Sequence, residues 1–278
     1  MEPIEFWKMS GSGNDFILID NRDGQIKDEE MGPLVQSACR RRESVGADGT
    51  IFVVGSDRYD FGWRFFNADG GEVEMCGNGG RCVSRFAYLK GITGPKMTFE
   101  TLAGPVSAEV KGRMVKVLMP RPGNLSMDLD IDYQPGWKSC DFINTGVPHV
   151  VIGVRELSTH PVREQGRSIR CHSRFSPEGT NANFVRRIGP GELEIRTYER
   201  GVEDETLACG TGAIACALVA SIREKVSSPV RVKTRGGEEL TIHFKRENTS
   251  FEQVWLEGNT SVIYQAQLNK EAIYRVED

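Results

Sequence analysis

The chain has 278 residues, and its 35 Lys and Arg against 39 Asp and Glu give a formal net charge of −4 at pH 7. This balance supplies no basic excess for a phosphate backbone, so nucleic acid is not an expected partner. No apolar run approaches the ~20 residues that cross a bilayer, and the N-terminus lacks a signal-peptide core, so we expect a cytoplasmic protein without membrane contact. At roughly 100–200 residues per domain, the length predicts two domains.

Short β-like runs and two helical segments fill the first part of the chain. A helix is predicted over residues 29–42, where apolar residues recur at helical spacing, and a second helix follows Cys76. Runs rich in β-branched and aromatic residues predict strands at 16–19, 50–54, 61–66, 97–99, 106–110 and 114–118.

The same order of elements is expected again further along the chain. A helix follows Cys209, and its residues 213–222 are apolar on every side, so it should be buried all round. Strands are predicted at 150–152, 183–185, 193–198, 230–232, 239–244 and 253–256.

This recurrence is an internal repeat, because Cys76 and Cys209 lie 133 residues apart and three other landmarks share that offset. These landmarks pair Gly13 with Gly146, Gly46 with Gly179, and Thr101-x-x-Gly104 with Thr234-x-x-Gly237. We therefore predict two homologous halves, 1–118 and 119–262, with a tail, 263–278, that adds a strand to the first half. The predicted fold class is α/β (α+β): two pseudo-symmetric domains from an internal duplication, each a curled mixed or antiparallel sheet around a central helix.

The seven cysteines include no pair at the Cys-x-x-Cys spacing that wraps zinc, so we expect no metal site. Cys76 and Cys209 differ from the others because each begins a Cys-Gly-x-Gly turn at a predicted helix start. A helix N-terminus offers free N–H groups and partial positive charge, which can poise a thiol near neutral pH. The glycines let the backbone approach an anion closely.

Two such turns in related halves suit the inversion of a stereocentre beside a carboxylate. One thiolate removes the α-proton, the second thiol returns a proton to the opposite face, and N–H groups stabilise the charge that moves onto the carboxylate. This chemistry needs no cofactor in principle. The sequence contains no Walker loop and no complete Gly-x-Gly-x-x-Gly fingerprint, so we expect none.

At this point the sequence resembles the diaminopimelate epimerase family. The motifs that carry the resemblance run through nearly the whole chain in order: Gly11-Ser-Gly-Asn-Asp-Phe16, Phe66-Asn-Ala-Asp-Gly-Gly-Glu72, Met75-Cys-Gly-Asn-Gly-Gly-Arg-Cys82, Pro148-His149, Gly179-Thr-Asn-Ala-Asn-Phe184, and Arg196-Thr-Tyr-Glu-Arg-Gly201 leading into Ala208-Cys-Gly-Thr-Gly212. The resemblance implies a pyridoxal-independent isomerase that interconverts LL- and meso-diaminopimelate for lysine and peptidoglycan synthesis. It also implies a site in the cleft between two similar domains, and it allows a homodimer.

The resemblance assigns roles residue by residue. Cys76 and Cys209 correspond to the two catalytic bases, and the direction of reaction decides which one takes the proton. The reacting carboxylate would be held at the two helix starts by the backbone of Gly77, Asn78, Gly210 and Thr211. The other polar groups of the substrate would be held by Asn14, Asn67, Asn181 and Arg200, with Arg200 suited to the distal carboxylate and Glu199 suited to an ammonium group.

Two positions depart from the family pattern. Val147 stands where a substrate-binding Asn is usual, and Gly49 stands where Gln often follows the Asp of the first half. Each change removes one hydrogen bond that the substrate could receive. His149, which follows Pro148, is a candidate residue lining the site together with these two positions.

Two alternatives stay open from the sequence. The first is another pyridoxal-independent racemase on the same scaffold, of the proline, hydroxyproline or histidine type, which the changes at Val147 and Gly49 would suit. Glu199 and Arg200 argue against it, because a small substrate has no distal zwitterion to bind. The second is a non-catalytic, anion-binding relative, and the retention of both cysteines argues against that one.

Overall fold

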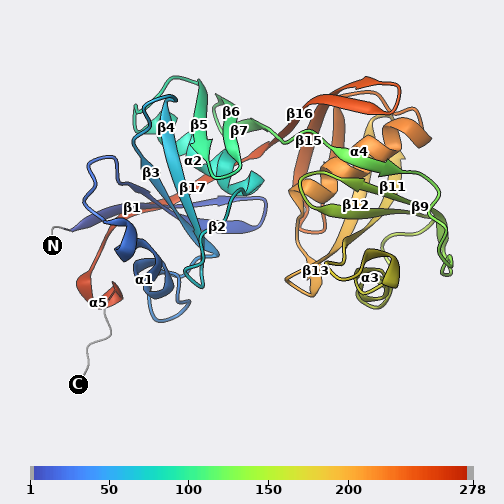
Figure 1. The fold of residues 1–278 in the computed structure, drawn as a ribbon, viewed down its shortest axis with the longest axis horizontal. Coiled ribbons are helices and arrows are strands. Elements are labelled where there is room, and N and C mark those ends of the chain that lie inside the picture. Colours follow the sequence, from blue (N-terminus) through green and yellow to red (C-terminus); the bar gives the residue numbers. More distant parts are fainter. Residues whose placement is uncertain (1–2, 274–278) are drawn as a thin grey trace. The chain divides into compact units, whose positions relative to one another are not determined.

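The computed structural model describes residues 3–273 (Figure 1). The chain divides into two compact units: Met1–Val117 with Asn259–Asp278, called unit 1, and Leu118–Gly258, called unit 2. This division falls one residue before the first boundary expected from the sequence and four residues before the second. Residues 259–262 therefore belong to unit 1.

Unit 1 is an eight-stranded mixed sheet with two main helices. Its strands pair in the order β17–β1–β2–β3–β4–β5–β6–β7, and only the β2/β3 and β4/β5 pairs are parallel. The elements are β1 (Ile4–Gly11), β2 (Asn14–Asp20), α1 (Asp28–Ala38), β3 (Gly49–Val54), β4 (Phe61–Asn67), α2 (Gly77–Leu89), β5 (Lys96–Thr101), β6 (Gly104–Lys111), β7 (Met114–Leu118), β17 (Ser261–Leu268) and the short α5 (Lys270–Ile273).

Unit 2 repeats this order of elements. Its strands pair as β8–β9–β10–β11–β12–β14–β15–β16, β13 pairs with β12 as well, and only β10/β11 and β12/β14 are parallel. The elements are β8 (Gly123–Ser126), β9 (Trp137–Asn144), β10 (Pro148–Val154), α3 (Val162–Arg170), a 3-10 turn (Ser173–Phe175), β11 (Asn181–Gly189), β12 (Glu192–Glu199), β13 (Asp204–Thr206), α4 (Gly210–Arg223), β14 (Val230–Lys233), β15 (Glu239–Glu247) and β16 (Ser250–Asn259).

Each sheet curls around one helix and carries the other on its outer face. Residues 212–221 of α4 are all buried, and this helix packs against β9, β10, β11, β12, β14 and β15. The helix α2 takes the same place in unit 1, against β1, β2, β3 and β6. The predicted fold class is confirmed.

The strands β2, β3 and β10 are buried along most of their length because both of their faces are covered, whereas β6 and β15 alternate between buried and more exposed residues. In β2, Ile17 and Ile19 belong to the core cluster beneath α1, with Leu34 and Val35 of that helix. The intervening Leu18 is equally buried on the other face. In unit 2 the outer cluster joins α3 to the sheet in the same way.

The helix predicted over residues 29–42 is too long, because α1 ends at Ala38. The following loop folds back, so that the N–H groups of Gly46 and Ala47 bind the carbonyls of Ala38 and Cys39 and replace the next helical turn. Residues 40–42 therefore lie in a loop. The strand expected from the tail is β17, which pairs with β1, and residues 274–278 of that tail lie outside the described residues.

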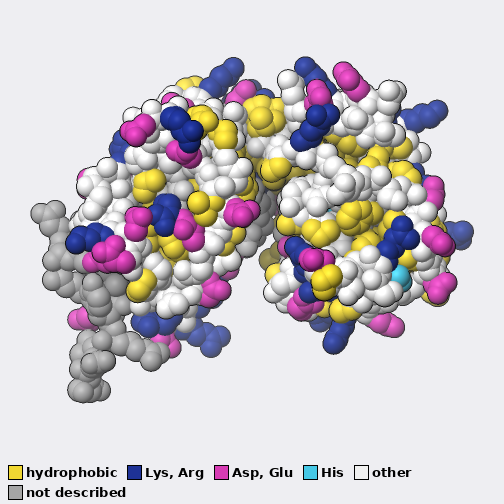
Figure 2. Space-filling model, viewed as in Figure 1, with side chains coloured by type: hydrophobic (Ala, Val, Ile, Leu, Met, Phe, Trp, Pro, Cys, Tyr) yellow, Lys and Arg dark blue, Asp and Glu magenta, His cyan; other side chains and the backbone are white. Residues whose placement is uncertain are grey.

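The face drawn in Figure 2 carries basic and acidic side chains interspersed over both units, without a continuous patch of one sign. Within residues 3–273, every helix is too short or too polar to reach across a bilayer.

The contact between α3 and β12 predicts one sensitive glycine. A Cβ at Gly166 would lie 2.4 Å from Cβ of Tyr198, so Gly166→Ala should force α3 from the sheet and lower the free energy of unfolding by about 1–3 kcal/mol in urea titration. Gly123→Ala in the same unit is the control, because a Cβ there meets nothing within 4 Å, and it should change the free energy by less than ~0.5 kcal/mol. Equal costs for the two variants would contradict this packing.

Candidate active site

Cys76 is the N-cap residue of α2. Its extended backbone (φ −145°, ψ 116°) ends the loop after β4, and its Sγ accepts a hydrogen bond from the Gly79 N–H at 3.4 Å. The thiol is half-buried. A Cβ at Gly79 would lie 3.2 Å from Ile51, so the first turn of the helix sits close against the sheet.

The polar side chains predicted in the first half gather at the edge of the sheet beside this helix start. Asn78 donates from Nδ2 to Oδ1 of Asn14 at 2.8 Å, and Asn14 donates from Nδ2 to Oδ2 of Asp48 at 2.9 Å. Asn67 is exposed at the end of β4, where it pairs in register with Gly49. Hydrogen bonds therefore connect the start of α2 to Asn14 and Asp48, and Gly49 and Asn67 lie next to Asp48 on β3 and β4.

Gly49 cannot carry the amide that the family pattern often places there. A Cβ at this position would lie 2.5 Å from the carbonyl oxygen of Phe66 and 2.7 Å from the ring of Phe65. The neighbouring backbone thus requires glycine, and no side chain at 49 can reach a ligand.

Cys209 is the N-cap residue of α4 in unit 2, with φ −125° and ψ 109°. Its Sγ accepts from the Gly212 N–H at 3.4 Å and lies 3.6 Å from Oγ1 of Thr211. The two cysteines thus cap corresponding helices in the same way. Cys209 is the more buried of the pair, at 6% exposure.

The position of Cys209 at a helix start predicts a thiol poised near neutral pH, but its surroundings raise the pKa instead. Burial, followed by the Glu199 carboxylate within hydrogen-bond reach, raises the pKa of the Cys209 thiol, and these effects outweigh the Thr211 hydroxyl and the Gly212 N–H. Burial also raises the pKa of Glu199, although the Thr206 hydroxyl and the Cys209 thiol donate to it. At neutral pH Cys209 therefore holds its proton.

Behind Cys209 lies a buried polar cluster that sequence reasoning identified only in part. Asn183 is fully buried, and its Nδ2 lies 2.9 Å from the Val150 carbonyl oxygen and 3.0 Å from Nδ1 of His149. Its Oδ1 accepts from the Thr197 hydroxyl at 3.0 Å. A Cβ on Gly212 would lie 2.2 Å from that oxygen, so the cluster packs directly under the first turn of α4.

His149, expected to line the site, is completely buried. Burial first, and then the positive charge of Arg200, lower the pKa of His149 to about 3, so the ring is neutral at physiological pH. Among the described residues its Nε2 has no hydrogen-bond partner.

The remaining predicted residues of unit 2 lie around the ends of β10, β11 and β12. Asn181 donates from Nδ2 to the Pro148 carbonyl at 3.1 Å and accepts from the Arg200 N–H at 2.9 Å. Val147 is half-buried in the preceding turn, which the Thr145 hydroxyl ties to the Thr211 carbonyl at 3.0 Å. Gly210 and Thr211 form the first turn of α4 beside it.

The polar residues of the site that sequence reasoning did not assign are Asp48, Thr145, Asn183, Thr197 and Thr206. The sequence signal for Asn183 was present, since it is an amide within an apolar strand. Within residues 3–273, no group of three or more His, Cys, Asp or Glu side chains is arranged to hold a metal ion.

A family model described as diaminopimelate epimerase matches residues 6–123 and 142–262. The chain is 46% identical to the diaminopimelate epimerase of Aquifex aeolicus (strain VF5), over 97% of this chain and 99% of that protein. It is 42% identical to the diaminopimelate epimerase of Hydrogenobaculum sp. (strain Y04AAS1), over 95% and 98% of the two chains.

Solved structures with the same fold are more distant in sequence. A phenazine biosynthesis protein of the PhzF family from Bacillus anthracis superposes with a TM-score of 0.75 at 16% identity, covering 97% of this chain and 100% of its own. A hydroxyproline epimerase from Agrobacterium vitis superposes with a TM-score of 0.68 at 15% identity, covering 98% and 94%. At these identities the likeness concerns the fold.

The Glu199 carboxylate predicts how the Cys209 thiol reacts. Because Glu199 helps to raise the pKa of Cys209, Glu199→Gln should lower it and move the pH dependence of iodoacetamide alkylation at Cys209 toward lower pH. Peptide mass spectrometry measures the modification at each cysteine. The exposed Cys171 is the internal control and should not change, and an unaltered Cys209 profile would contradict the coupling.

Burial of His149 predicts a loss of stability in mild acid. The folded-state pKa of about 3 lies below the unfolded value of ~6.5, so between these limits only the unfolded chain binds the proton. Stability should therefore fall as the pH drops below 6.5, by up to ~1.4 kcal/mol per pH unit from this group. Urea unfolding between pH 7 and 5 should show a shallower dependence for His149→Gln; parallel curves would exclude a buried neutral His149.

Proposed function

The chain belongs to the diaminopimelate epimerase family, and we propose that its two helix-capping cysteines, Cys76 and Cys209, perform the epimerisation as a paired base and acid. As an epimerase of this family it is an isomerase that acts on diaminopimelate in lysine biosynthesis. The observation that carries the proposal is that the two thiols occupy equivalent positions in the two units. Each caps a helix buried in its own unit, and each accepts a hydrogen bond at 3.4 Å from the N–H of the glycine three residues later.

The reaction explains why two thiols are needed. Conversion of LL- to meso-diaminopimelate inverts one α-carbon, so a proton leaves from one face and another arrives at the opposite face. A single group on one face would return the proton with retention of configuration. One thiolate and one thiol exchange roles in each turnover, and the return of the enzyme to its first state completes the cycle.

The N–H groups at the two helix starts are suited to the reacting carboxylate. As the α-proton leaves, negative charge moves onto this carboxylate, and donors already aimed at it stabilise that charge without reorganisation. Gly77 and Asn78 supply such groups in unit 1, and Gly210 and Thr211 supply them in unit 2. This electrostatic support takes the place of an electron-withdrawing cofactor, so we propose that none is used.

The proton on Cys209 sets the starting state of the free enzyme. Because Cys209 is protonated beside the buried Glu199, the free enzyme starts in one of the two directions of the reaction. In that direction Cys76, as the thiolate, takes the α-proton, and Cys209 delivers its own proton to the other face of the carbon. Cys76 then holds a proton and Cys209 is the thiolate, which is the state required for the reverse reaction. Glu199 would also attract the substrate ammonium group, whose charge offsets that of the carboxylate.

Recognition of the rest of the substrate is assigned to polar side chains of both units. Arg200 is half-buried beside Asn181 and can bind a distal carboxylate through its planar fork. Asn14 and Asn67 would receive other polar groups of the substrate. Val147 provides only apolar contact, so Arg200 has a larger share in distal recognition than the family pattern suggests.

We propose a cytoplasmic protein with a small zwitterionic substrate, without nucleic-acid or membrane partners, that can form a homodimer. The balanced surface charge and the biosynthetic reaction support this setting.

Replacement of either thiol tests the mechanism. Cys76→Ala and Cys209→Ala should each lower kcat for LL- and meso-diaminopimelate by at least ~100-fold, the usual contribution of a general acid or base. Cys216→Ala is the control, because this buried cysteine lies in the same helix as Cys209 but two turns from its start, and it should retain kcat. A Cys76→Ala or Cys209→Ala enzyme that still inverted configuration at the wild-type rate would refute the paired mechanism.

A further inference from the structure

We propose that Asp48 is a positioning residue that fixes the orientation of the Asn14 side chain for substrate, and that Arg41 holds Asp48 in place. This inference rests on the proposed function of Asn14 in substrate binding. It concerns a carboxylate that is not one of the residues assigned to substrate or to the reacting atoms.

The side chains form one directed chain of hydrogen bonds. The buried Arg81 donates to Oδ1 of Asn78 at 3.0 Å, Asn78 donates to Oδ1 of Asn14, and Asn14 donates to Oδ2 of Asp48. An amide has distinct ends, so a donor at its oxygen and an acceptor at its nitrogen leave Asn14 only one orientation. One N–H and one oxygen lone pair of Asn14 then remain for a ligand.

Asp48 is itself held by a cluster of charges. Arg41 donates from Nη2 to Oδ1 of Asp48 at 2.7 Å and binds both oxygens of Asp15, at 2.6 and 3.1 Å. Lys8, at only 6% exposure, lies 2.8 Å from Oδ2 of Asp15, an oxygen that Arg41 also binds. Burial alone would raise the pKa of Asp15, but Arg41 and Lys8 outweigh it and hold that pKa below the ordinary range.

The corresponding segment of unit 2 shows that the turn at Gly46, which precedes Asp48, does not need this charge cluster to fold. The offset of 133 residues places Asn181 at the position of Asp48, Val147 at that of Asn14, and Pro148 at that of Asp15. The glycine of the turn nevertheless keeps its conformation, with φ +73° at Gly46 and +71° at Gly179. The carboxylate is present only in the half that has an asparagine for it to orient.

The loss of a side chain at position 49 increases the importance of Asn14. Since the backbone around Gly49 excludes any side chain, the polar contacts of unit 1 with substrate fall on Asn14, Asn67 and the start of α2. An amide that rotated freely would present oxygen and nitrogen in turn, and so would lose both affinity and selectivity for the polar groups of the substrate.

The test is a double-mutant cycle on KM in the full-length enzyme. Asp48→Asn removes the charge that accepts from Asn14 and should raise KM for LL-diaminopimelate about tenfold, with kcat within about threefold of wild type, because hydrogen bonds to charged groups have roughly this effect. In an Asn14→Ala background the same change should have no further effect on KM. Arg41→Met should raise KM less, and its effect should also vanish in that background.

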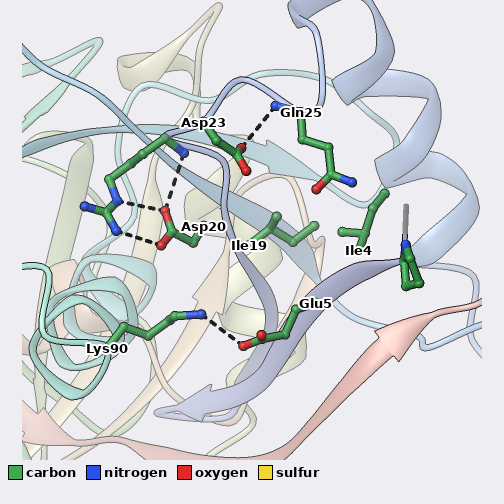
Figure 3. Close-up of a pocket in the computed structure, with 9 residues that line it drawn as sticks. Ile4, Glu5, Ile19, Asp20, Asp23, Gln25 and Lys90 are labelled. Carbon is green, nitrogen blue, oxygen red and sulfur yellow. Dashed lines mark hydrogen bonds and ion pairs between the residues drawn. The ribbon is translucent and has the colours of Figure 1, made fainter. Parts of the chain in front are cut away.

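A matched control lies at the far end of β2, the strand that begins with Asn14. Asp20, the last residue of β2, forms a two-point ion pair with Arg22 at 2.8 and 2.9 Å and lines the pocket drawn in Figure 3. Asp20→Asn should leave both KM and kcat unchanged. Thermal unfolding of all variants separates a change in stability from a change in KM.

Each outcome decides the proposal. An unchanged KM for Asp48→Asn would overturn it, and so would effects of Asp48→Asn and Asn14→Ala that multiply, because Asp48 would then act independently of Asn14. If Asp48→Asn does not fold, the Arg41→Met cycle gives the same decision. A wild-type enzyme inactive on diaminopimelate would refute the proposed function, whereas an active wild type with independent effects would refute only this inference.

Discussion

The free N–H groups at the start of a buried helix are the constraint on which this molecule depends. Both α2 and α4 are buried along most of their length, so each sheet has to curl around its helix and leave the helix start at the sheet edge. Donors at such an end are costly unless something accepts them. A cysteine Sγ accepts one of them in each unit, and in the proposed function the substrate carboxylate accepts others. Core packing and anion binding thus meet in the same residues.

The two units share this scaffold but surround it with different electrostatics. In unit 1 the neighbouring amides are connected to an exposed set of ion pairs through Asp48 and Arg41. In unit 2 the neighbours of Cys209 are buried and form a cluster of neutral groups, with a carboxylate whose pKa is raised. A symmetric backbone therefore holds an asymmetric pair of thiols. In the proposed function one thiol has to be protonated and the other deprotonated before the first proton moves, and this asymmetry favours the proton on Cys209.

Much of the fold could be predicted from the sequence because the repeat and the apolar periodicity are strong signals. The helices after Cys76 and Cys209, and most of the strands that flank them, lie where the pattern indicates. The end of α1 could not be predicted, because loop N–H groups that arrive eight residues later replace the helical bonds of Ala38 and Cys39. The strands β1 and β9 and the helix α3 were not predicted from the sequence. In α3 the signal is weak, because only two of its buried side chains, Val162 and Ile169, are apolar.

The site was predictable in its residue types and less so in its electrostatics. Motifs identify Cys209 and Glu199, but their pKa values depend on burial and on contact with each other, which no local pattern encodes. Likewise, the need for glycine at position 49 arises from the carbonyl of Phe66 on the next strand. The network around Asp48 joins three segments of unit 1, so it becomes visible only when the chain is folded.

The central claim is that two separate groups handle the proton, and deuterium incorporation in heavy water tests it most directly. LL-diaminopimelate converted by the wild-type enzyme to a small extent in D₂O should yield meso-diaminopimelate with one deuterium at the inverted carbon, while the recovered LL-substrate stays unlabelled. This result follows if one thiol removes the proton and the other delivers a solvent-derived deuteron. Product that retained the original hydrogen would contradict the account, because a single base would then carry the proton between faces.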